Sequence, residues 1–484
     1  MKEEYHYSKK ETTFRAMVFS AFAFALIGFA KILFNIIVSR SFGADSIIVL
    51  GMSNVALSFA LLISMICSSG FSNAINKFIS DSLSRNDRAS ARTIYDRILS
   101  LNSLIILPIS FLILVFHKEI AAILQIGDVY VLLSLGIAVT SNFYYLLRAA
   151  MYSLNETRQY LAREFLSNIF FFSILILSII FLSPEYILCS FSGMYLLFIF
   201  LAGREINKKL LKTKKHHKIA IGGIETYAGL TTVGTILSVS LIYLASLCAG
   251  AFLGATEAAL FAAAYSTASI ILMIPNVISM VLLPRMSFSW GKNDTDSIRN
   301  GISFWTHSLI IICALIIIPF GIFGKTILTL LFGDQYSIAH MTLILILIGI
   351  FFQTASRPST IALVSTRYIH ITASVSAIAF IVAILTWLIA VQYFGIIGIA
   401  LGFMLAAIIN SCGSIFFAEL QWRSGFRQYL LPIGSAILLL SLLSTIIEQD
   451  GILIESLSSM IFIILFTILN IRFIRTFFKE IRHI

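Results

Sequence analysis

Charged residues are scarce in this sequence: they make up 12% of its 484 positions, whereas hydrophobic residues make up 59%. A soluble globular chain has about a quarter of its residues charged. The mean hydropathy of +0.96 therefore excludes an ordinary soluble protein and indicates an integral membrane protein. Its apolar runs repeatedly reach the roughly 20 residues that a membrane-spanning helix needs, and they lack the ten-residue alternation of an outer-membrane barrel.

Motifs of nucleotide hydrolysis and metal chemistry are also missing. The sequence contains no GxxxxGK[ST] and no HExxH, and its five cysteines lie in or beside apolar runs without CxxC spacing. Acidic residues are nearly confined to loops and span edges, and none is expected inside the first six predicted spans away from their edges. We therefore expect no cofactor, no metal and no disulfide, and a transporter rather than an enzyme.

The apolar runs predict an all-α polytopic fold. Fourteen spans are expected at roughly 16–39, 46–68, 98–116, 129–150, 164–182, 186–203, 227–252, 258–283, 303–321, 337–361, 371–394, 396–418, 430–447 and 452–471. Basic residues then fall mainly in alternate connections, a bias that places both termini in the cytoplasm. The run "NKKLLKTKKHHK" at 207–218 is interpreted as a cytoplasmic loop that fixes topology, and the alternative is recognition of an acidic partner. The net charge of +11 needs no nucleic acid.

Two segments of the sequence resemble each other. "SFGADSIIVLGMSNVALSFALLI" near position 43 matches "AFLGATEAALFAAAYSTASIILMI" near position 254, and "SRNDRASAR" matches "WGKNDTDSIR". At a nearly constant offset, Arg148 falls on Arg357. Because each copy has six helices, an even number, the repeats are expected to be parallel. The pattern predicts an N-lobe over 1–210, a C-lobe over 219–422 and two additional helices over 423–484.

Ionisable residues inside predicted spans are candidate site residues, because burying a charge in hydrocarbon costs several kcal/mol. Lys31 lies far from both ends of the first span and shares a helical face with Asn35. It is interpreted as lining a cavity, with a structural pairing to a carbonyl as the alternative. Arg148 and Arg357 either line the same cavity or extend to the cytoplasm. Asn54 is a further candidate, although polar residues in spans often serve helix packing.

The turn "SFGADS", the stretch "FLGATEAALFAAAYS…IPNVISMVLLPRMS" and the twofold six-helix plan resemble the Wzx-type polysaccharide flippases. These belong to the MOP superfamily, which also holds the multidrug and toxin extrusion (MATE) transporters and the lipid II flippases. The resemblance implies a V-shaped pair of lobes around a central cavity. It also implies the flipping of an undecaprenyl-pyrophosphate-linked oligosaccharide, such as an O-antigen unit, across the cell inner membrane. Lys31, Arg148 and Arg357 are the residues that fit the role of holding the pyrophosphate.

The expected partners follow from this resemblance: a lipid-linked oligosaccharide, membrane lipid and glycan polymerase or assembly proteins. Two alternatives stay open. A cation-coupled multidrug exporter would need a carboxylate inside an N-lobe span, whereas a membrane glycan polymerase or ligase would need a long outer loop carrying catalytic residues. The final pair of helices departs from the twelve-span plan of many Wzx relatives and leaves the glycan open.

Overall fold

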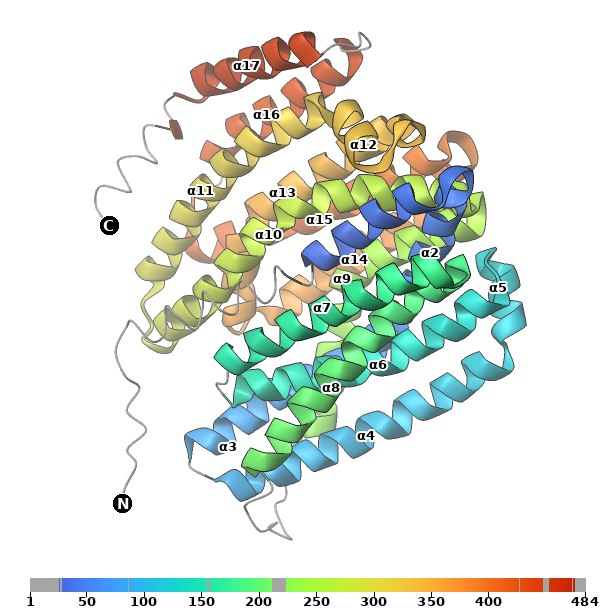
Figure 1. The fold of residues 1–484 in the computed structure, drawn as a ribbon. Helices are drawn as coiled ribbons and strands as arrows, with labels where there is room; N and C mark the ends of the chain where they lie inside the picture. The colour runs from blue at the N-terminus through green and yellow to red at the C-terminus, as the bar shows by residue number, and fades with distance from the viewer. Residues whose placement is uncertain are drawn as a thin grey trace. The chain divides into compact units, whose positions relative to one another are not determined.

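The computed structural model describes residues 26, 28–85, 87–154, 157–210, 223–425, 427–446, 452–471 and 473–474. The described residues form helices and short connections and contain no strand (Figure 1). Ten of the described helices are long and apolar enough to cross a membrane, or eleven if the two halves of the bent helix α9 count as one. The chain is therefore a multi-pass membrane protein with an all-helical fold.

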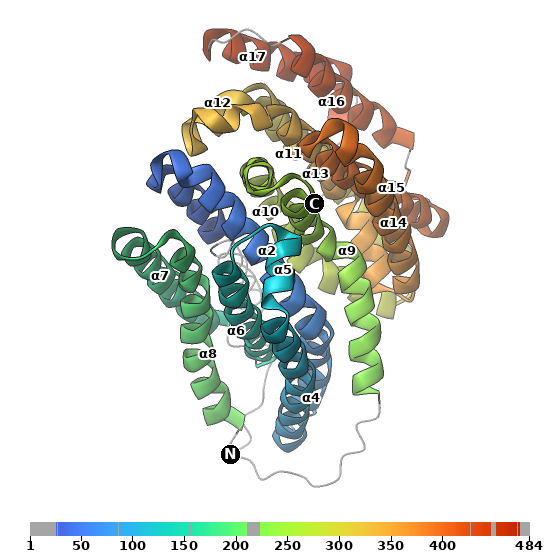
Figure 2. The same cartoon turned by 90° about the vertical axis from the view of Figure 1, so that its right-hand side faces the viewer.

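Two compact units divide the chain. The first unit comprises Met1–Phe34 and Met52–Leu247. It contains most of α2 (Ser46–Ala74), a π-helical turn η2 (Ile75–Ile79), α3 (Ser80–Ser84), α4 (Arg88–Val115), α5 (His117–Leu124), α6 (Asp128–Ser153), α7 (Thr157–Phe181), a 3-10 turn η3 (Pro184–Leu188), α8 (Cys189–Leu210) and most of α9 (Ile224–Leu253). In this unit α8 packs against both α6 and α7, and α4 runs alongside α6 (Figure 2).

The second unit comprises Asn35–Gly51 and Cys248–Ile484. Its elements are η1 (Gly43–Asp45), α10 (Ala255–Gly291), α11 (Thr295–Ile322), α12 (Gly324–Phe332), η4 (Asp334–Ala339), α13 (His340–Ser365), α14 (Ile369–Phe394), α15 (Ile396–Trp422), α16 (Arg427–Ile446) and α17 (Ile452–Leu469). Helix α13 packs against α10, α11 and α15, and α14 packs along α15. The two last helices, α16 and α17, contact α11.

The two matched hydrophilic loops start their helices in the same way. The Asp87 carboxylate accepts a hydrogen bond from the Ser90 amide at 2.9 Å, and the Asp294 carboxylate accepts one from the Ser297 amide at 2.9 Å. Each aspartate is therefore the N-cap of the following helix, α4 or α11, and satisfies one of its free amides. A long helix, a short helix and three long helices then follow in both units.

Residues 35–51 pack within the second unit. The buried Asn35 donates from Nδ2 to Ser266 Oγ at 2.6 Å. Arg40 donates to the carbonyl oxygens of Thr329 and Leu330 at 2.7 and 2.6 Å, and it thereby supplies partners for free carbonyls at the end of α12. These contacts join parts of the sequence that lie more than 200 residues apart, as shown by the separation of 231 positions between Asn35 and Ser266.

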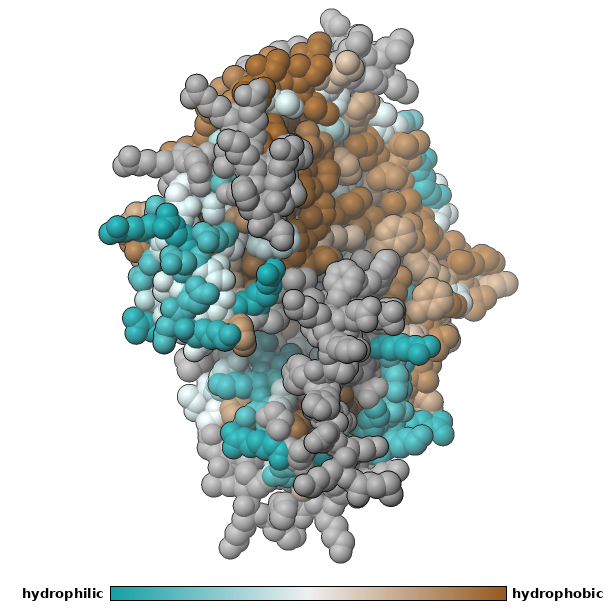
Figure 3. Space-filling view, turned by 90° about the vertical axis from the view of Figure 1, so that its left-hand side faces the viewer, coloured by the Kyte–Doolittle hydropathy of each residue, from teal (hydrophilic) through white to brown (hydrophobic). Residues whose placement is uncertain are grey.

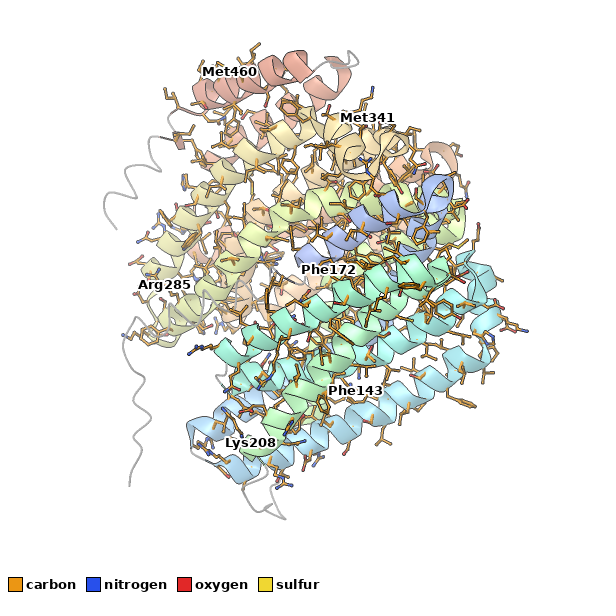
Figure 4. All side chains as sticks on the ribbon, in the orientation of Figure 1. Phe143, Phe172, Lys208, Arg285, Met341 and Met460 are labelled. Carbon is orange, nitrogen blue, oxygen red and sulfur yellow. The ribbon has the colours of Figure 1, made fainter. Side chains whose placement is uncertain are left out.

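Every one of the fourteen predicted spans overlaps a helix in the described residues. That all fourteen cross the membrane remains a prediction. The twofold repeat also remains a prediction, as do the N-lobe, the C-lobe and the final pair of helices at 1–210, 219–422 and 423–484. The basic run at 207–218 begins in the last turn of α8, where Figure 4 labels Lys208, and from 211 onward it lies outside the described residues.

Large hydrophobic side chains are exposed on several helices, as expected of a surface that faces lipid. Phe111 on α4 is 65% exposed, Ile389 on α14 is 64% exposed and Met460 on α17, labelled in Figure 4, is 63% exposed. Figure 3 shows hydrophobic residues gathered over much of the visible face, with hydrophilic residues beside them. In water such a surface would favour association, whereas in a bilayer it is solvated by lipid.

Candidate functional site

A cavity of about 410 Å³ lies within the first unit, between α2 with its π-helical turn, α6 and α9. Ten of its fourteen lining residues have polar side chains, although the helices around it are strongly apolar. They are Ser68, Ser69, Ser72, Asn73, Asn76, Tyr145, Arg148, Tyr152, Thr235 and Tyr243. Polar groups in a membrane-embedded bundle are costly unless they contact a partner or a wet cavity, so this cavity is the candidate functional site.

Helical periodicity explains why these side chains converge. On α6, Tyr145, Arg148 and Tyr152 follow one another at steps of three and four, so they project from one face. On α9, Thr235 and Tyr243 lie two steps of four apart and share a face in the same way. The polar residues of α2 also follow this spacing, which gives the cavity three polar walls.

The approach of α9 to α2 depends on a glycine. A Cβ atom added at Gly70 would lie 2.0 Å from the carbonyl oxygen of Ala228, which is far inside van der Waals contact. The same end of α9 is tied to α4 by an ion pair, in which Arg97 Nη2 lies 2.5 Å from Glu225 Oε1. Small residues commonly permit such close helix packing in membranes. Gly70 thus permits the close approach of α9, which carries the lining residues Thr235 and Tyr243.

Among the lining residues that the structure describes, Arg148 is the one that carries a charge. Its guanidinium carbon lies 5.9 Å from the ring centroid of Tyr152 and 5.7 Å from that of Tyr160. Aromatic faces attract a cation and hold it in an orientation without neutralising its charge. Arg148 is therefore placed to bind an anion in the cavity.

Two hydroxyl groups of the lining have unmet hydrogen-bonding capacity. Ser69 Oγ and Ser72 Oγ are buried and have no hydrogen-bond partner among the described residues. Buried polar groups are normally paired, and an unpaired one costs about 1–3 kcal/mol. Together with Arg148 they form a set that suits a ligand rich in acceptor oxygens.

Lys31, the clearest candidate from the sequence, lies next to this cavity. Its ammonium nitrogen is 5.9 Å from the ring centroid of Tyr243, and Tyr243 lines the cavity from α9. Lys31 is partly buried and is not itself among the lining residues. The structure therefore brings Lys31 and Arg148 to the surroundings of one cavity, since Lys31 contacts Tyr243 and both Tyr243 and Arg148 line it. A substrate-binding role for either residue stays a prediction.

The other three candidates lie elsewhere. Asn54 is 3% exposed in the first unit and is not part of the cavity lining. Asn35 and Arg357 belong to the second unit, where Asn35 donates to Ser266. Arg357 donates from Nε to Ser279 Oγ at 2.8 Å and from Nη2 to Asn276 Oδ1 at 3.4 Å, and both acceptors are on α10. Binding roles for these three residues also stay predictions.

Sequence reasoning missed Glu164. The predicted span 164–182 begins at this residue, but α7 begins at Thr157, so Glu164 lies two turns inside the helix and is 1% exposed. The Tyr144 hydroxyl donates to Glu164 Oε1 at 2.5 Å, and Arg148 interacts electrostatically with the carboxylate. A spacing of four separates both Tyr144 from Arg148 and Tyr160 from Glu164, a pattern that could have indicated facing stripes on two adjacent helices.

The described residues contain no cluster of three or more His, Cys, Asp or Glu side chains arranged to hold a metal ion. All five cysteines are free. The lining residues offer a positive charge, hydroxyl groups and aromatic rings for recognition.

The fold and the cavity define a polytopic helical membrane protein of the transporter class. A family described as "Polysaccharide biosynthesis protein" matches residues 13–290, more than half of the chain, and the chain belongs to this family. The match confirms the resemblance drawn from the sequence, that of a MOP-type flippase. No curated protein sequence gives a significant match.

Solved structures show the same fold at low sequence identity. The lipid II flippase MurJ in an inward closed conformation is 16% identical, with a TM-score of 0.70, and the alignment covers 94% of this chain and 99% of MurJ. A mutant of the MATE transporter VcmN from Vibrio cholerae is 13% identical, with a TM-score of 0.62 and coverage of 86% and 97%.

A third structure is a MOP superfamily transporter from Pyrococcus furiosus, described as having a binding pocket of reverse polarity. It is 10% identical, with a TM-score of 0.63 and coverage of 86% of this chain and 96% of that one. These likenesses show the fold of the MOP superfamily.

Proposed function

We propose that this protein is a flippase that moves a lipid-linked oligosaccharide from the inner to the outer leaflet of the cell inner membrane by alternating access. The family match and the MOP fold support a flippase or a related transporter and argue against an enzyme. The observation that carries the proposal is the polar cavity with Arg148 in its wall. A cationic, hydroxyl-rich hollow inside an apolar bundle suits an anionic head group attached to a lipid.

The substrate class proposed is an undecaprenyl-pyrophosphate-linked glycan. A pyrophosphate diester carries about two negative charges and several acceptor oxygens, which complement the guanidinium of Arg148 and the hydroxyls of Ser69 and Ser72. Lys31, whose ammonium nitrogen lies 5.9 Å from the ring centroid of Tyr243, adds positive potential near the cavity. We also assign Arg357, Asn35 and Asn54 to the translocation path, as the sequence predicted.

Export of such an anion is favoured by a membrane potential that is negative inside. Each elementary charge that moves outward gains about 2.3 kcal/mol per 100 mV. In this proposal the fourteen predicted spans form two lobes and an additional pair of helices, both termini face the cytoplasm, and glycan polymerase or assembly proteins receive the flipped product.

A cation-coupled multidrug exporter is the second candidate, and Glu164 is the observation that favours it. The first six predicted spans contain no carboxylate away from their edges, but Glu164 is 1% exposed inside α7. The neighbouring Arg148 weighs against binding of a cationic drug, because its positive charge repels a second cation at the cavity. The flippase therefore accounts for more of the site.

The test compares two arginines in cells that lack the native gene and depend on a plasmid copy. Arg148 lines the cavity, whereas Arg158 on α7 is exposed. We expect Arg148→Ala to abolish surface glycan, Arg148→Lys to retain part of it and Arg158→Ala to leave it unchanged at equal expression. Wild-type surface glycan with Arg148→Ala would overturn the proposal, and export of cationic dyes by the wild type would favour the second candidate.

A further inference from the structure

Arg148 has a buried counter-charge on the neighbouring helix. Glu164 on α7 is 1% exposed, and Tyr144, which donates to it, lies one turn before Arg148 on α6. Tyr160 lies one turn before Glu164 on α7, and the Arg148 guanidinium carbon is 5.7 Å from its ring, so the guanidinium and the carboxylate are close neighbours. The Tyr144 hydroxyl donates to Glu164 Oε1 and fixes the carboxylate in place.

The two charges differ in their access to a ligand. Arg148 lines the cavity, whereas Glu164 is not among the lining residues. An isolated buried carboxylate costs several kcal/mol, so Glu164 gains from the nearby guanidinium. A ligand anion that enters the cavity must therefore share Arg148 with a negative charge that cannot leave.

We infer that Glu164 is a specificity-determining residue of the cavity, which competes with the anionic ligand for Arg148 and so restricts binding to anions of high charge and many oxygens. The inference rests on the proposed function for the identity of the lipid-linked pyrophosphate. With Arg148 and Glu164 balanced, a monoanion such as chloride gains little by entering. A pyrophosphate gains more, because it adds about two charges and also engages free hydroxyls such as Ser69 and Ser72.

The matched arginine of the second unit is held differently. Arg357 donates to the neutral acceptors Ser279 Oγ and Asn276 Oδ1. At the offset that aligns Arg148 with Arg357, the position of Glu164 is occupied by Ala373. A carboxylate is thus not needed to hold an arginine at this place in the fold. Its presence beside Arg148 calls for a role in the cavity rather than in packing alone.

The test measures binding of inorganic pyrophosphate and of chloride to the purified full-length protein. In Glu164→Gln the amide oxygen still accepts from Tyr144, so the fold is retained while the charge is lost. We expect pyrophosphate to bind about tenfold more tightly to this variant and chloride binding to increase by a larger factor, because a competing charge beside the guanidinium is gone. In transport, the same variant should lower both KM and kcat, since a more tightly held substrate is released more slowly.

Two further variants separate this role from a structural one. Glu119→Gln removes an exposed carboxylate of α5 in the same unit and should leave anion binding unchanged. Adding Arg148→Ala to Glu164→Gln should remove the gain in affinity. Unchanged or weaker pyrophosphate binding by Glu164→Gln, including the case in which neither protein binds, would overturn the inference. Failure of the wild type to export glycan would instead refute the proposed function and leave the binding result to stand by itself.

A pH series supplies a second readout, with sulfate as the probe because its charge is constant near neutral pH. The groups that face Glu164 are Tyr144, Tyr145 and Arg148 on α6, Tyr195 on α8 and Tyr160 on α7 itself. Phenols and guanidinium groups ordinarily keep their protons near neutral pH. Protonation of Glu164 removes the competing charge, so sulfate affinity should rise as the pH falls, and more steeply in the wild type than in Glu164→Gln. Parallel pH profiles would contradict the inference.

Discussion

Lys31 and Tyr243 form a cation–π contact at the edge of the cavity, with the ammonium nitrogen 5.9 Å from the ring centroid. The contact joins the first helix to α9, whose residue Tyr243 also lines the hollow. An ammonium group held against an aromatic face keeps its positive charge available to a nearby anion. This relationship connects the isolated lysine of the sequence with the cavity of the structure.

The first prediction concerns that lysine. Lys31→Ala should abolish surface glycan while expression and topology are retained, and Lys31→Arg should keep part of the activity because the charge remains. Lys118→Ala, which removes an exposed lysine of α5, should behave as wild type. The measurement is surface glycan in cells at equal protein levels. Normal glycan export with Lys31→Ala would remove this residue from the translocation path.

The second prediction concerns the glycine that lets α9 approach α2. In Gly70→Ala the new methyl group would meet the carbonyl oxygen of Ala228, so we expect displaced packing, a lower unfolding temperature and loss of glycan export. Gly229→Ala on α9 is the matched control, because an added Cβ there meets nothing within 4 Å. Alanine is the better helix former by up to about 1 kcal/mol, so the control should be neutral or more stable. Equal unfolding temperatures for both variants would show that the close contact does not affect the stability of the protein.

The third prediction concerns the two aspartate caps. Asp87→Ala and Asp294→Ala should each lower the free energy of unfolding by about 1 kcal/mol, because each leaves an amide at the start of α4 or α11 without its partner. The Asn variants should retain most of the stability, since asparagine caps nearly as well. The two losses should add, because the caps belong to different units. Denaturant or thermal unfolding of the purified protein in detergent measures these free energies. Single Ala variants with the same free energy of unfolding as the wild type would refute the capping role.

Much of the fold follows from local patterns in the sequence. Helix positions follow from apolar runs of spanning length, and the two Asn-Asp loops contain Asp87 and Asp294, which cap α4 and α11 in the same way. A charge inside an apolar run predicts a functional position for Arg148, because burying that charge in hydrocarbon is costly. The structure places Arg148 in a cavity wall.

Other features depend on contacts that no local pattern contains. The helical face that Asn35 shares with Lys31 predicts a cavity wall, and no local pattern indicates that its amide donates to Ser266, 231 positions away. The predicted span 164–182 begins at Glu164, although the helix begins seven residues before the glutamate. Hydropathy locates the apolar part of a helix, whereas capping and tertiary packing decide where the helix starts.

The central claim is that the cavity beside Arg148 holds the pyrophosphate of the lipid-linked substrate. The most direct measurement uses Asn76→Cys, at a lining position that is exposed, in a variant without the five native cysteines, labelled by a polar maleimide with and without undecaprenyl pyrophosphate. Ser80→Cys on α3, which is exposed, is the control. The account predicts that the lipid protects position 76 at least several-fold, that undecaprenol does not, and that Arg148→Ala removes the protection. Equal labelling of Asn76→Cys with and without the pyrophosphate lipid would contradict it.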